Sequence, residues 1–221
     1  RHMSDAFDQL IPDAQDFCRR LADDNTRDWY QDHKDEYTTR LKRPAELLLD
    51  TLRPRLEALT GGPARIKLFR INRDLRFAKG QPPYKDYLHM LWYAPDGGLA
   101  PLGWFLGIEK TRVRVGAGYM SLEGAALTRW REVMGGDAGA AIAAGIEAEL
   151  ARGAEMREPA LKRVPSPYGQ DHPRGAFLRR KGMALFRDIP APETDLPGAV
   201  MAEFERLWPV FGPLHAALNR P

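Results

Sequence analysis

The sequence predicts a single compact α+β domain, in which a mostly antiparallel sheet of about four to five strands is flanked by N-terminal and C-terminal helices. Helical spacing of apolar residues runs through residues 13–59 and returns after Ser121, whereas residues 66–119 are rich in β-branched and aromatic residues. Helices, then consecutive strands, then helices are typical of the α+β class. With 221 residues, the chain is long enough to bury one core.

The N-terminal region is expected to hold three helices. Asn25 or Thr26 can cap the second helix, because either side chain can accept a hydrogen bond from a free backbone N–H. Pro44 suits the first turn of the third helix, and Pro54 inside that helix is expected to kink or end it. The apolar face of the first helix follows the spacing i, i+3, i+4 and i+7, at Ala14, Phe17, Cys18 and Leu21.

The middle region is expected to form the sheet. Residues 112–117 alternate between polar or small side chains and apolar ones, as a half-buried strand does. Lys110-Thr111 is short enough to join this strand to the preceding one as a hairpin. The expected strands are residues 66–77, 87–93, 102–109, 112–119 and 184–189. The expected later helices begin at Ser121 and cover 137–151 and 198–219, the last broken near Pro209 and Pro213.

Composition excludes several classes of protein. No run of about 18 apolar residues occurs, so we expect no membrane-spanning helix and no membrane partner. Cys18 is the single cysteine, and we expect a buried thiol in a cytoplasmic protein. The first three residues, Arg1 to Met3, are expected to be a remnant of cloning ahead of a domain that spans residues 4–221.

The common catalytic signatures are absent from the sequence. None of the three serines lies in a G-x-S-x-G motif, and there is no P-loop. The five histidines are scattered without the spacing of metal ligands. We therefore expect neither a metal ion nor a cofactor.

The density of positive charge in residues 65–85 is the main functional signal. Seven of these 21 residues are basic and one is acidic, a net charge of +6, whereas the whole chain carries +3. Cations crowded together and interleaved with apolar residues need anions nearby. The block therefore predicts an anion-binding site.

On a regular strand, Arg70, Asn72, Asp74 and Arg76 would share one face and Arg73 would lie on the other. We expect Asp74 to orient the arginines, whose planar guanidinium groups suit a phosphate or carboxylate ligand. The alternative is an internal salt-bridge network that braces the sheet. Arg73 is then either a buried structural partner or a residue of the site.

The connection after this strand contains two consecutive prolines. Their stiffness can hold Lys79, Tyr84 and Lys85 in fixed positions for a ligand. The alternative is a plain surface turn.

A second basic block covers residues 161–181 and carries a net charge of +5. Two such blocks on an otherwise acidic chain suggest a shared positive cavity. Asp171 and His172 stand at an expected helix start, where free N–H groups can bind an anion, and the alternative is a simple helix cap. For catalysis, His172 is the first candidate acid or base and Asp74 the second.

The leading hypothesis is a protein with a pocket for a small anionic ligand, a phosphate or a carboxylate. Whether the protein only binds this ligand or also acts on it as an enzyme stays open. A nucleic-acid-binding protein is a second class, because the basic residues are interleaved with Phe69, Phe77 and Tyr84, on which bases could stack. A non-catalytic interaction or structural module is a third, in which the arginines only brace the sheet. The oligomeric state stays open.

Three segments in this order, NTRDWYQDHKDEY (25–37), FRINRDLRFAKGQPPYK (69–85) and LKRVPSPYGQDHP (161–173), resemble the motifs of a bacterial and fungal family catalogued as domain of unknown function 2461. The resemblance covers nearly the whole chain and implies a compact α+β fold but no activity. Tyr30 and Asn72 depart from the family pattern, and the departure at Asn72 can alter which ligand fits beside Arg70. By motif match, the family-hallmark positions are Arg27, Trp29, Arg70, Arg73, Asp74, Arg76, Phe77, Lys79, Pro83, Tyr84, Lys85, Lys162, Asp171, His172 and Pro173.

Overall fold

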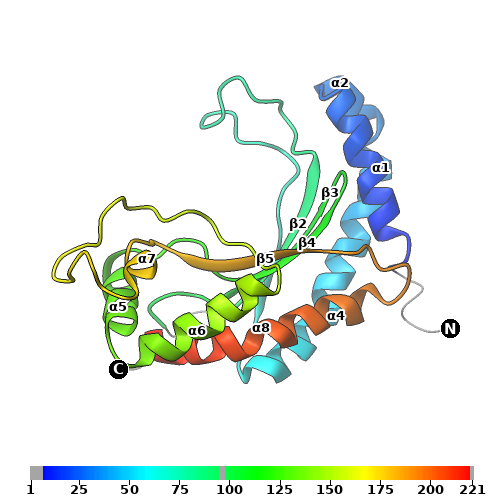
Figure 1. Cartoon of the computed structure of the whole chain (residues 1–221). Helices are drawn as coiled ribbons and strands as arrows, with labels where there is room; N and C mark the ends of the chain where they lie inside the picture. The colour runs from blue at the N-terminus through cyan, green and yellow to red at the C-terminus, as the bar shows by residue number, and fades with distance from the viewer. Residues whose placement is uncertain (1–6, 95–97, 220–221) are drawn as a thin grey trace.

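A computed structural model describes residues 7–94 and 98–219, so the expected cloning remnant lies outside the described residues. One five-stranded antiparallel sheet has helices packed against one face, which confirms the α+β class (Figure 1). The strands are β1 (Arg65–Leu68), β2 (Tyr87–Tyr93), β3 (Gly103–Glu109), β4 (Val113–Tyr119) and β5 (Met183–Ile189). The helices are α1 (Leu10–Asp23), α2 (Arg27–Asp32), α3 (Lys34–Glu36), the π-helical η2 (Tyr37–Lys42), α4 (Arg43–Thr60), α5 (Gly124–Gly135), α6 (Ala138–Ala151), α7 (Gly175–Leu178) and α8 (Leu196–Asn219).

The strands lie side by side in the order β1-β2-β3-β4-β5, and every neighbouring pair is antiparallel. The short hairpin between β3 and β4 is confirmed, and Glu109 N donates to Arg112 O at 2.9 Å to close it. Because β1 and β5 form the two edges, the segment that follows β1 and the segment that precedes β5 lie at different edges of the sheet.

The expected strand over residues 66–77 is wrong beyond Leu68. Residues 69–86 instead form a projecting hairpin loop, here called the arm, which retains one isolated bridge between Asn72 and Tyr84. Two consecutive prolines in its returning half cannot donate ladder hydrogen bonds. A local turn, in which Phe77 N donates to Asp74 O at 3.2 Å, then closes the tip.

Helix ends follow the sequence in part. Thr26 caps α2, because its Oγ1 accepts a hydrogen bond from Trp29 N at 3.3 Å. The expected cap by Asp171 is wrong: α7 begins only at Gly175, after Arg174, whose side chain makes no capping bond.

The prolines inside the long helices do not end them. Helix α4 continues past Pro54, and α8 continues past Pro209 and Pro213, so the expected break in α8 is wrong. Each proline removes one backbone donor. Buried apolar residues on both sides of each proline tie the helix to the core, and this packing outweighs the lost bonds.

One face of the sheet forms the core with α1, α4 and α8. The Trp92 indole Nε1–H donates to Leu49 O on α4 at 2.9 Å, which satisfies its polar group inside the core. Cys18 on α1 is buried, as expected. Nine residues of β2, β3 and β4 on this face are buried: Leu88, Met90, Trp92, Trp104, Leu106, Ile108, Val113, Val115 and Ala117.

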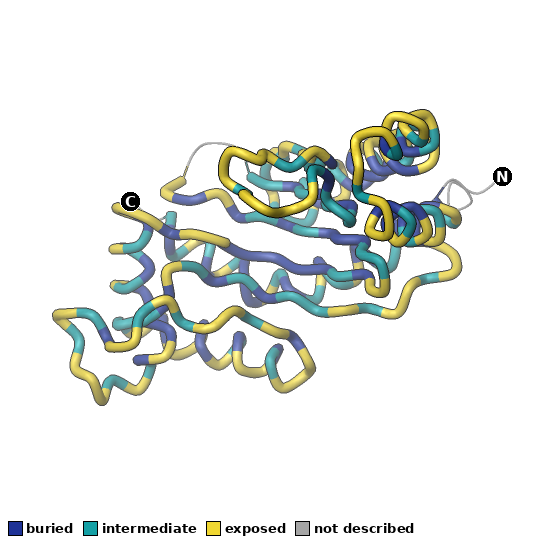
Figure 2. The backbone as a smooth tube through the Cα atoms, turned by 90° about the horizontal axis from the view of Figure 1, so that it is seen from above, coloured by how far each residue is buried: buried dark blue, intermediate teal, exposed yellow. Residues whose placement is uncertain are grey.

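The opposite face of the sheet, here called the open face, is only partly covered (Figure 2). The segment around Glu155 runs along β5 and pairs with it at Phe186. Glycines and half-buried side chains alternate with the core residues there, at His89, Leu91, Gly103, Phe105, Gly107, Glu109, Arg114, Gly116, Gly118 and Phe186. Within the described residues, no helix is long and apolar enough to cross a lipid bilayer.

Candidate functional site

A groove of about 560 Å³ lies on the open face. Phe105 of β3 and Phe186 of β5 form its floor, with ring centroids 5.7 Å apart in an edge-to-face arrangement. The floor stays flat because a Cβ atom at Gly107 would lie 2.9 Å from the Phe105 ring, and one at Gly116 would collide with Phe186. Glycine at these two positions therefore lets the aromatic rings lie across the strands.

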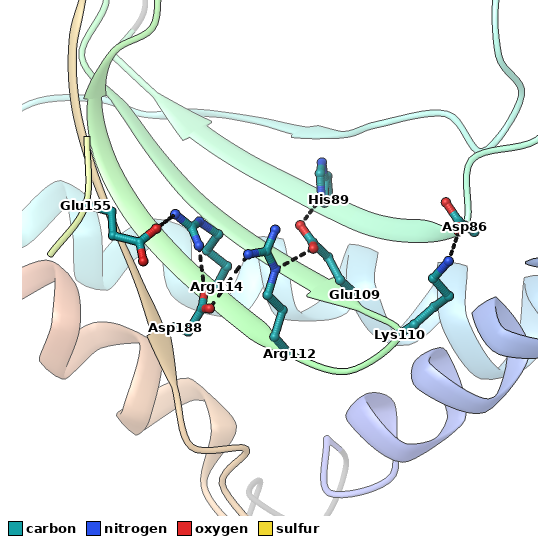
Figure 3. Close-up of polar contacts among 8 residues, drawn as sticks. All are labelled: Asp86, His89, Glu109, Lys110, Arg112, Arg114, Glu155 and Asp188. Carbon is teal, nitrogen blue, oxygen red and sulfur yellow. Dashed lines mark hydrogen bonds and ion pairs between the residues drawn. The ribbon is translucent and has the colours of Figure 1, made fainter. Parts of the chain in front are cut away.

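A row of charged side chains crosses the groove (Figure 3). His89 Nε2 lies 3.4 Å from Glu109 Oε1, without the geometry of a hydrogen bond. Arg112 Nε donates to Glu109 Oε2 at 2.6 Å. The carboxylate of Glu109 thus lies between an imidazole and a guanidinium.

The row continues toward β5 with a second arginine. Arg114 donates to Asp188 Oδ1 at 2.8 Å and to Glu155 Oε2 at 2.5 Å, and Arg112 Nη1 lies 3.7 Å from Asp188 Oδ2. The side chain of Arg114 is 15% exposed, so its two pairs are partly shielded from water. These arginines are already matched by carboxylates of the same chain.

His89 is half-buried between aromatic rings. Its ring stacks on Tyr87 at 4.0 Å and meets the edge of Phe105 at 4.8 Å. Burial lowers the pKa of His89, and the nearby carboxylate of Glu109 opposes this only in part. The imidazole is therefore neutral at neutral pH and can accept a proton, with Glu109 placed to stabilise the charged form.

A second group of charges lies where the arm leaves β1. Lys85 Nζ donates to Arg70 O at 3.0 Å, and Lys67 Nζ lies 4.8 Å from the ring centroid of Phe69, which lines the groove. Burial is the main cause of the lowered pKa of Lys85, and the positive charges of Arg73 and Lys67 lower this pKa further. Like charges are therefore concentrated at this point.

Arg73 is held in place by neutral groups. Its Nε donates to Pro82 O at 3.0 Å and its Nη1 to Gln81 Oε1 at 2.6 Å. Among the described residues, no carboxylate forms an ion pair with Lys67, Arg73 or Lys85. We call these three residues the arm-base cations. Arg157, which lines the groove on the side of β5, also forms no ion pair among the described residues.

Other expected site residues lie at the exposed tip of the arm. Asp74 accepts two hydrogen bonds from Arg76, at 3.0 and 2.7 Å, and this arginine lowers the pKa of the Asp74 carboxyl. Asp74 therefore orients one arginine rather than several, in solvent. Asn72 and Lys79 are also exposed, and Phe77 is 86% exposed.

Tyr84 is buried and anchors the arm. Its ring stacks on Tyr30 at 4.2 Å. Asn25 Nδ2 donates to Tyr84 O, and Tyr84 N donates to Asn25 Oδ1, both at 3.0 Å. Two of the three sequence motifs therefore meet at this contact, which holds the arm against the start of α2.

The second basic block, residues 161–181, does not lie beside the arm-base cations. The expected common cavity of the two basic blocks is therefore wrong. His172 Nδ1 accepts a hydrogen bond from Arg174 N at 3.0 Å, and Arg174 donates to Met134 O and Gly136 O at the end of α5. The shallow pocket beside His172 is lined only by residues of 162–179. Asp171 is exposed beside it.

The physical reason for this separation is the order of the strands. The arm joins β1 to β2 at one edge, whereas residues 157–174 precede β5 at the other edge (Figures 1 and 2). Antiparallel pairing of Tyr119 with Met183 also puts the start of β5 at the end of the sheet away from the arm. The number of charges along a stretch of sequence says nothing about strand order or about which ends of the strands lie together.

The sequence singled out neither His89 nor the charged row. Arg112, Arg114 and Glu109 bracket the predicted hairpin, so their strand periodicity would have placed them on one face. The signal for His89 is its place between core residues of β2, which puts it on the face that the helices leave open.

Comparisons with known proteins give one match. The family model described as "Conserved hypothetical protein (DUF2461)" matches residues 13–216, nearly the whole chain. No curated protein and no solved structure matches. The match covers the arm, the charged row and the segment around His172 together.

Proposed function

The chain belongs to the DUF2461 family of conserved hypothetical proteins, and from this premise we propose that it binds a small ligand with an anionic group and an aromatic or apolar ring on the open face. The observation that carries the proposal is the position of the arm-base cations beside an aromatic-floored groove. They lack a carboxylate partner among the described residues, so an external anion would relieve their mutual repulsion.

The internal salt-bridge alternative applies to a different set of arginines. Arg112 and Arg114 are held by Glu109, Asp188 and Glu155, and these pairs stiffen the groove rather than leaving free charge. A ligand anion would therefore be held by Arg73 and Lys85 at the arm base. Its ring would lie on Phe69 and Phe105, where aromatic contact adds to burial.

Calorimetric titration with phenyl phosphate tests the proposal. We expect Lys85→Gln and Arg73→Gln each to weaken binding about tenfold or more, because a hydrogen bond to a charged group contributes roughly 1.5–3 kcal/mol. Lys79→Gln at the exposed tip is the matched control and should bind as the wild type does. Inorganic phosphate should bind more weakly than phenyl phosphate, because it cannot use the aromatic floor.

Equal affinity of all variants, or no binding by the wild type, would contradict the proposal. A labelled oligonucleotide whose binding weakens with salt and with Arg76→Gln would instead favour the nucleic-acid alternative. A sharp loss of stability in Arg73→Gln without any ligand effect would favour the structural module.

The proposed compartment is the cytoplasm. The single cysteine, Cys18, is a buried thiol inside the core, as suits a reducing environment. Fractionation of cells that express the natural chain tests this, and recovery of the protein outside the cytoplasmic fraction would contradict it.

A further inference from the structure

A separate pocket of about 340 Å³ lies on the helix-covered side, at the end of the sheet away from the arm. Trp104 of β3, Leu56 of α4, and Trp208 and His215 of α8 contribute to its wall. Its described lining residues include no Asp, Glu, Lys or Arg. The described part of the lining therefore favours a neutral guest.

The hydrogen bonds around His215 identify which ring nitrogen carries the proton. Asn219 Oδ1 accepts a hydrogen bond from Leu99 N at 2.6 Å, which fixes the orientation of the Asn219 amide. Asn219 Nδ2 therefore faces His215 Nδ1, at 3.0 Å, and also donates to the backbone oxygen of His215 at 2.9 Å. Tyr119 Oη lies 2.7 Å from the same Nδ1.

An amide NH₂ group can only donate, so its contact with Nδ1 favours the neutral tautomer of His215 that carries its proton on Nε2. Burial of His215 lowers its pKa and favours this neutral form. Among the described residues, no hydrogen bond to Nε2 is present, and this atom is not among the fully buried ones. The Nε2–H group is therefore a free donor on a residue that lines the pocket.

We propose that this pocket binds a neutral, largely apolar molecule of two fused rings that carries one hydrogen-bond acceptor, which His215 Nε2–H recognises. The volume is roughly twice that of the apolar cavity of about 150 Å³ that admits benzene. The half-buried indole ring of Trp208 supplies apolar surface for such rings, and the buried ring of Trp104 supports it from behind at a centroid distance of 6.1 Å. The site is independent of the groove on the open face.

The pair 1-indanone and indane tests both parts of the proposal, because the two molecules differ by one carbonyl acceptor. We expect 1-indanone to bind about five- to tenfold more tightly than indane, the difference that one hydrogen bond makes. Titration of isotopically labelled protein, followed through the indole N–H signals of its tryptophans, measures both affinities. The Trp208 signal should shift with both molecules.

Two variants distinguish the hydrogen bond from His215 from the fit of the guest in the pocket. His215→Phe removes the donor but keeps a ring, so 1-indanone should then bind no more tightly than indane. Ala100→Leu fills the pocket and should weaken both molecules. Lys85→Gln should leave both affinities unchanged, whereas it weakens phenyl phosphate at the groove.

Three results would overturn the proposal. They are equal affinity of the wild type for the two molecules, signals that shift only outside the pocket, and undiminished binding by Ala100→Leu. If His215→Phe does not fold, the comparison of the two molecules on the wild type and on Ala100→Leu still decides the question.

Discussion

Single residues set the electrostatics of this protein through what surrounds them. His89 lies beside Glu109 on the open face. At the other end of the sheet, Nδ1 of His215 faces Tyr119 Oη and Asn219 Nδ2. Burial is the first cause of the lowered pKa at both histidines. The same residue type thus provides a proton acceptor at one cavity and a fixed N–H donor at the other.

Stability should depend on pH through these two histidines. Because both pKa values are lowered from the ordinary 6.5 in the folded state, the unfolded chain binds more protons as the pH falls. We expect the free energy of unfolding, measured in urea, to decrease between about pH 7 and pH 5 and to be insensitive to these groups above that range. His89→Gln and His215→Gln should each reduce this slope, and an unchanged slope in the double variant would contradict the assignment.

A buried carboxylate on α6 makes a second residue-scale prediction. Glu149 is 3% exposed and lies 2.8 Å from Arg152 Nη1, 3.3 Å from Arg206 Nη2 and 3.6 Å from Arg187 Nη2. Glu149→Gln should destabilise the fold by roughly 3 kcal/mol in urea denaturation, because it leaves Arg152 and Arg187 without a counter-charge and leaves Arg206 with Glu203 alone. Glu147→Gln, exposed on the same helix, should cost little, and equal losses would show that the carboxylate contributes no specific stability.

At the scale of elements, the arm is stable because a helix end replaces the missing strand partner. Beyond Leu68 the arm leaves the sheet, and Asn25 at the start of α2 pairs with both backbone groups of Tyr84. Helix and arm are thus one unit, although Asn25 and Tyr84 are 59 residues apart in the sequence. This contact positions the arm-base cations beside the groove.

Asn25→Ala should release the arm. The loss of two hydrogen bonds to a partly buried backbone should cost roughly 1–3 kcal/mol in urea denaturation and should speed amide hydrogen exchange at Tyr84. Asn72→Ala is the control, because the exposed Asn72 pairs with Tyr84 through its backbone. Unchanged exchange at Tyr84 in Asn25→Ala would show that the ring stacking with Tyr30 alone holds the arm.

At the scale of the whole molecule, one sheet and one shared core join the N-terminal and C-terminal helices. Phe17 of α1, Leu48 of α4 and Phe204 of α8 belong to one buried apolar cluster against the sheet. Such a core favours cooperative unfolding of the whole chain. The two cavities then form on opposite faces of the same sheet.

Labelling of Cys18 tests this cooperativity. Burial raises the pKa of the Cys18 thiol to about 12, so the thiolate that reacts with a disulfide reagent is scarce in the folded state. We expect labelling with such a reagent along a urea titration to coincide with the loss of far-ultraviolet circular dichroism in one transition. Labelling complete before the dichroism is lost would show that α1 unfolds separately and that the chain is not a single domain.

Much of the fold could be predicted because its signals are local. The helical stripe of α1, the cap at Thr26 and the alternation in β4 each depend on neighbours within a few residues. The errors arose where tertiary contacts compete with local preference. Packing keeps α8 continuous across Pro209, and the absence of a strand partner ends β1 at Leu68.

The candidate site could be predicted less well. Charge density drew attention to Arg73 and Lys85, which belong to the proposed site, but it grouped them with Asp171 and His172, which lie beyond the other edge of the sheet. It also missed His89, whose ring contacts come from β2, from β3 and from the arm. Counting charges along the chain cannot show which residues of different strands come into contact.

By itself, the sequence determined the class of fold, the elements with strong periodicity and the stretch of chain where positive charge is concentrated, because these properties are encoded between near neighbours. Only the tertiary structure decided which cations face a common groove and which are matched by carboxylates of the same chain. The reason is that strand order and face are settled by long-range pairing, and a charge interacts with whatever the folded backbone brings within a few ångströms.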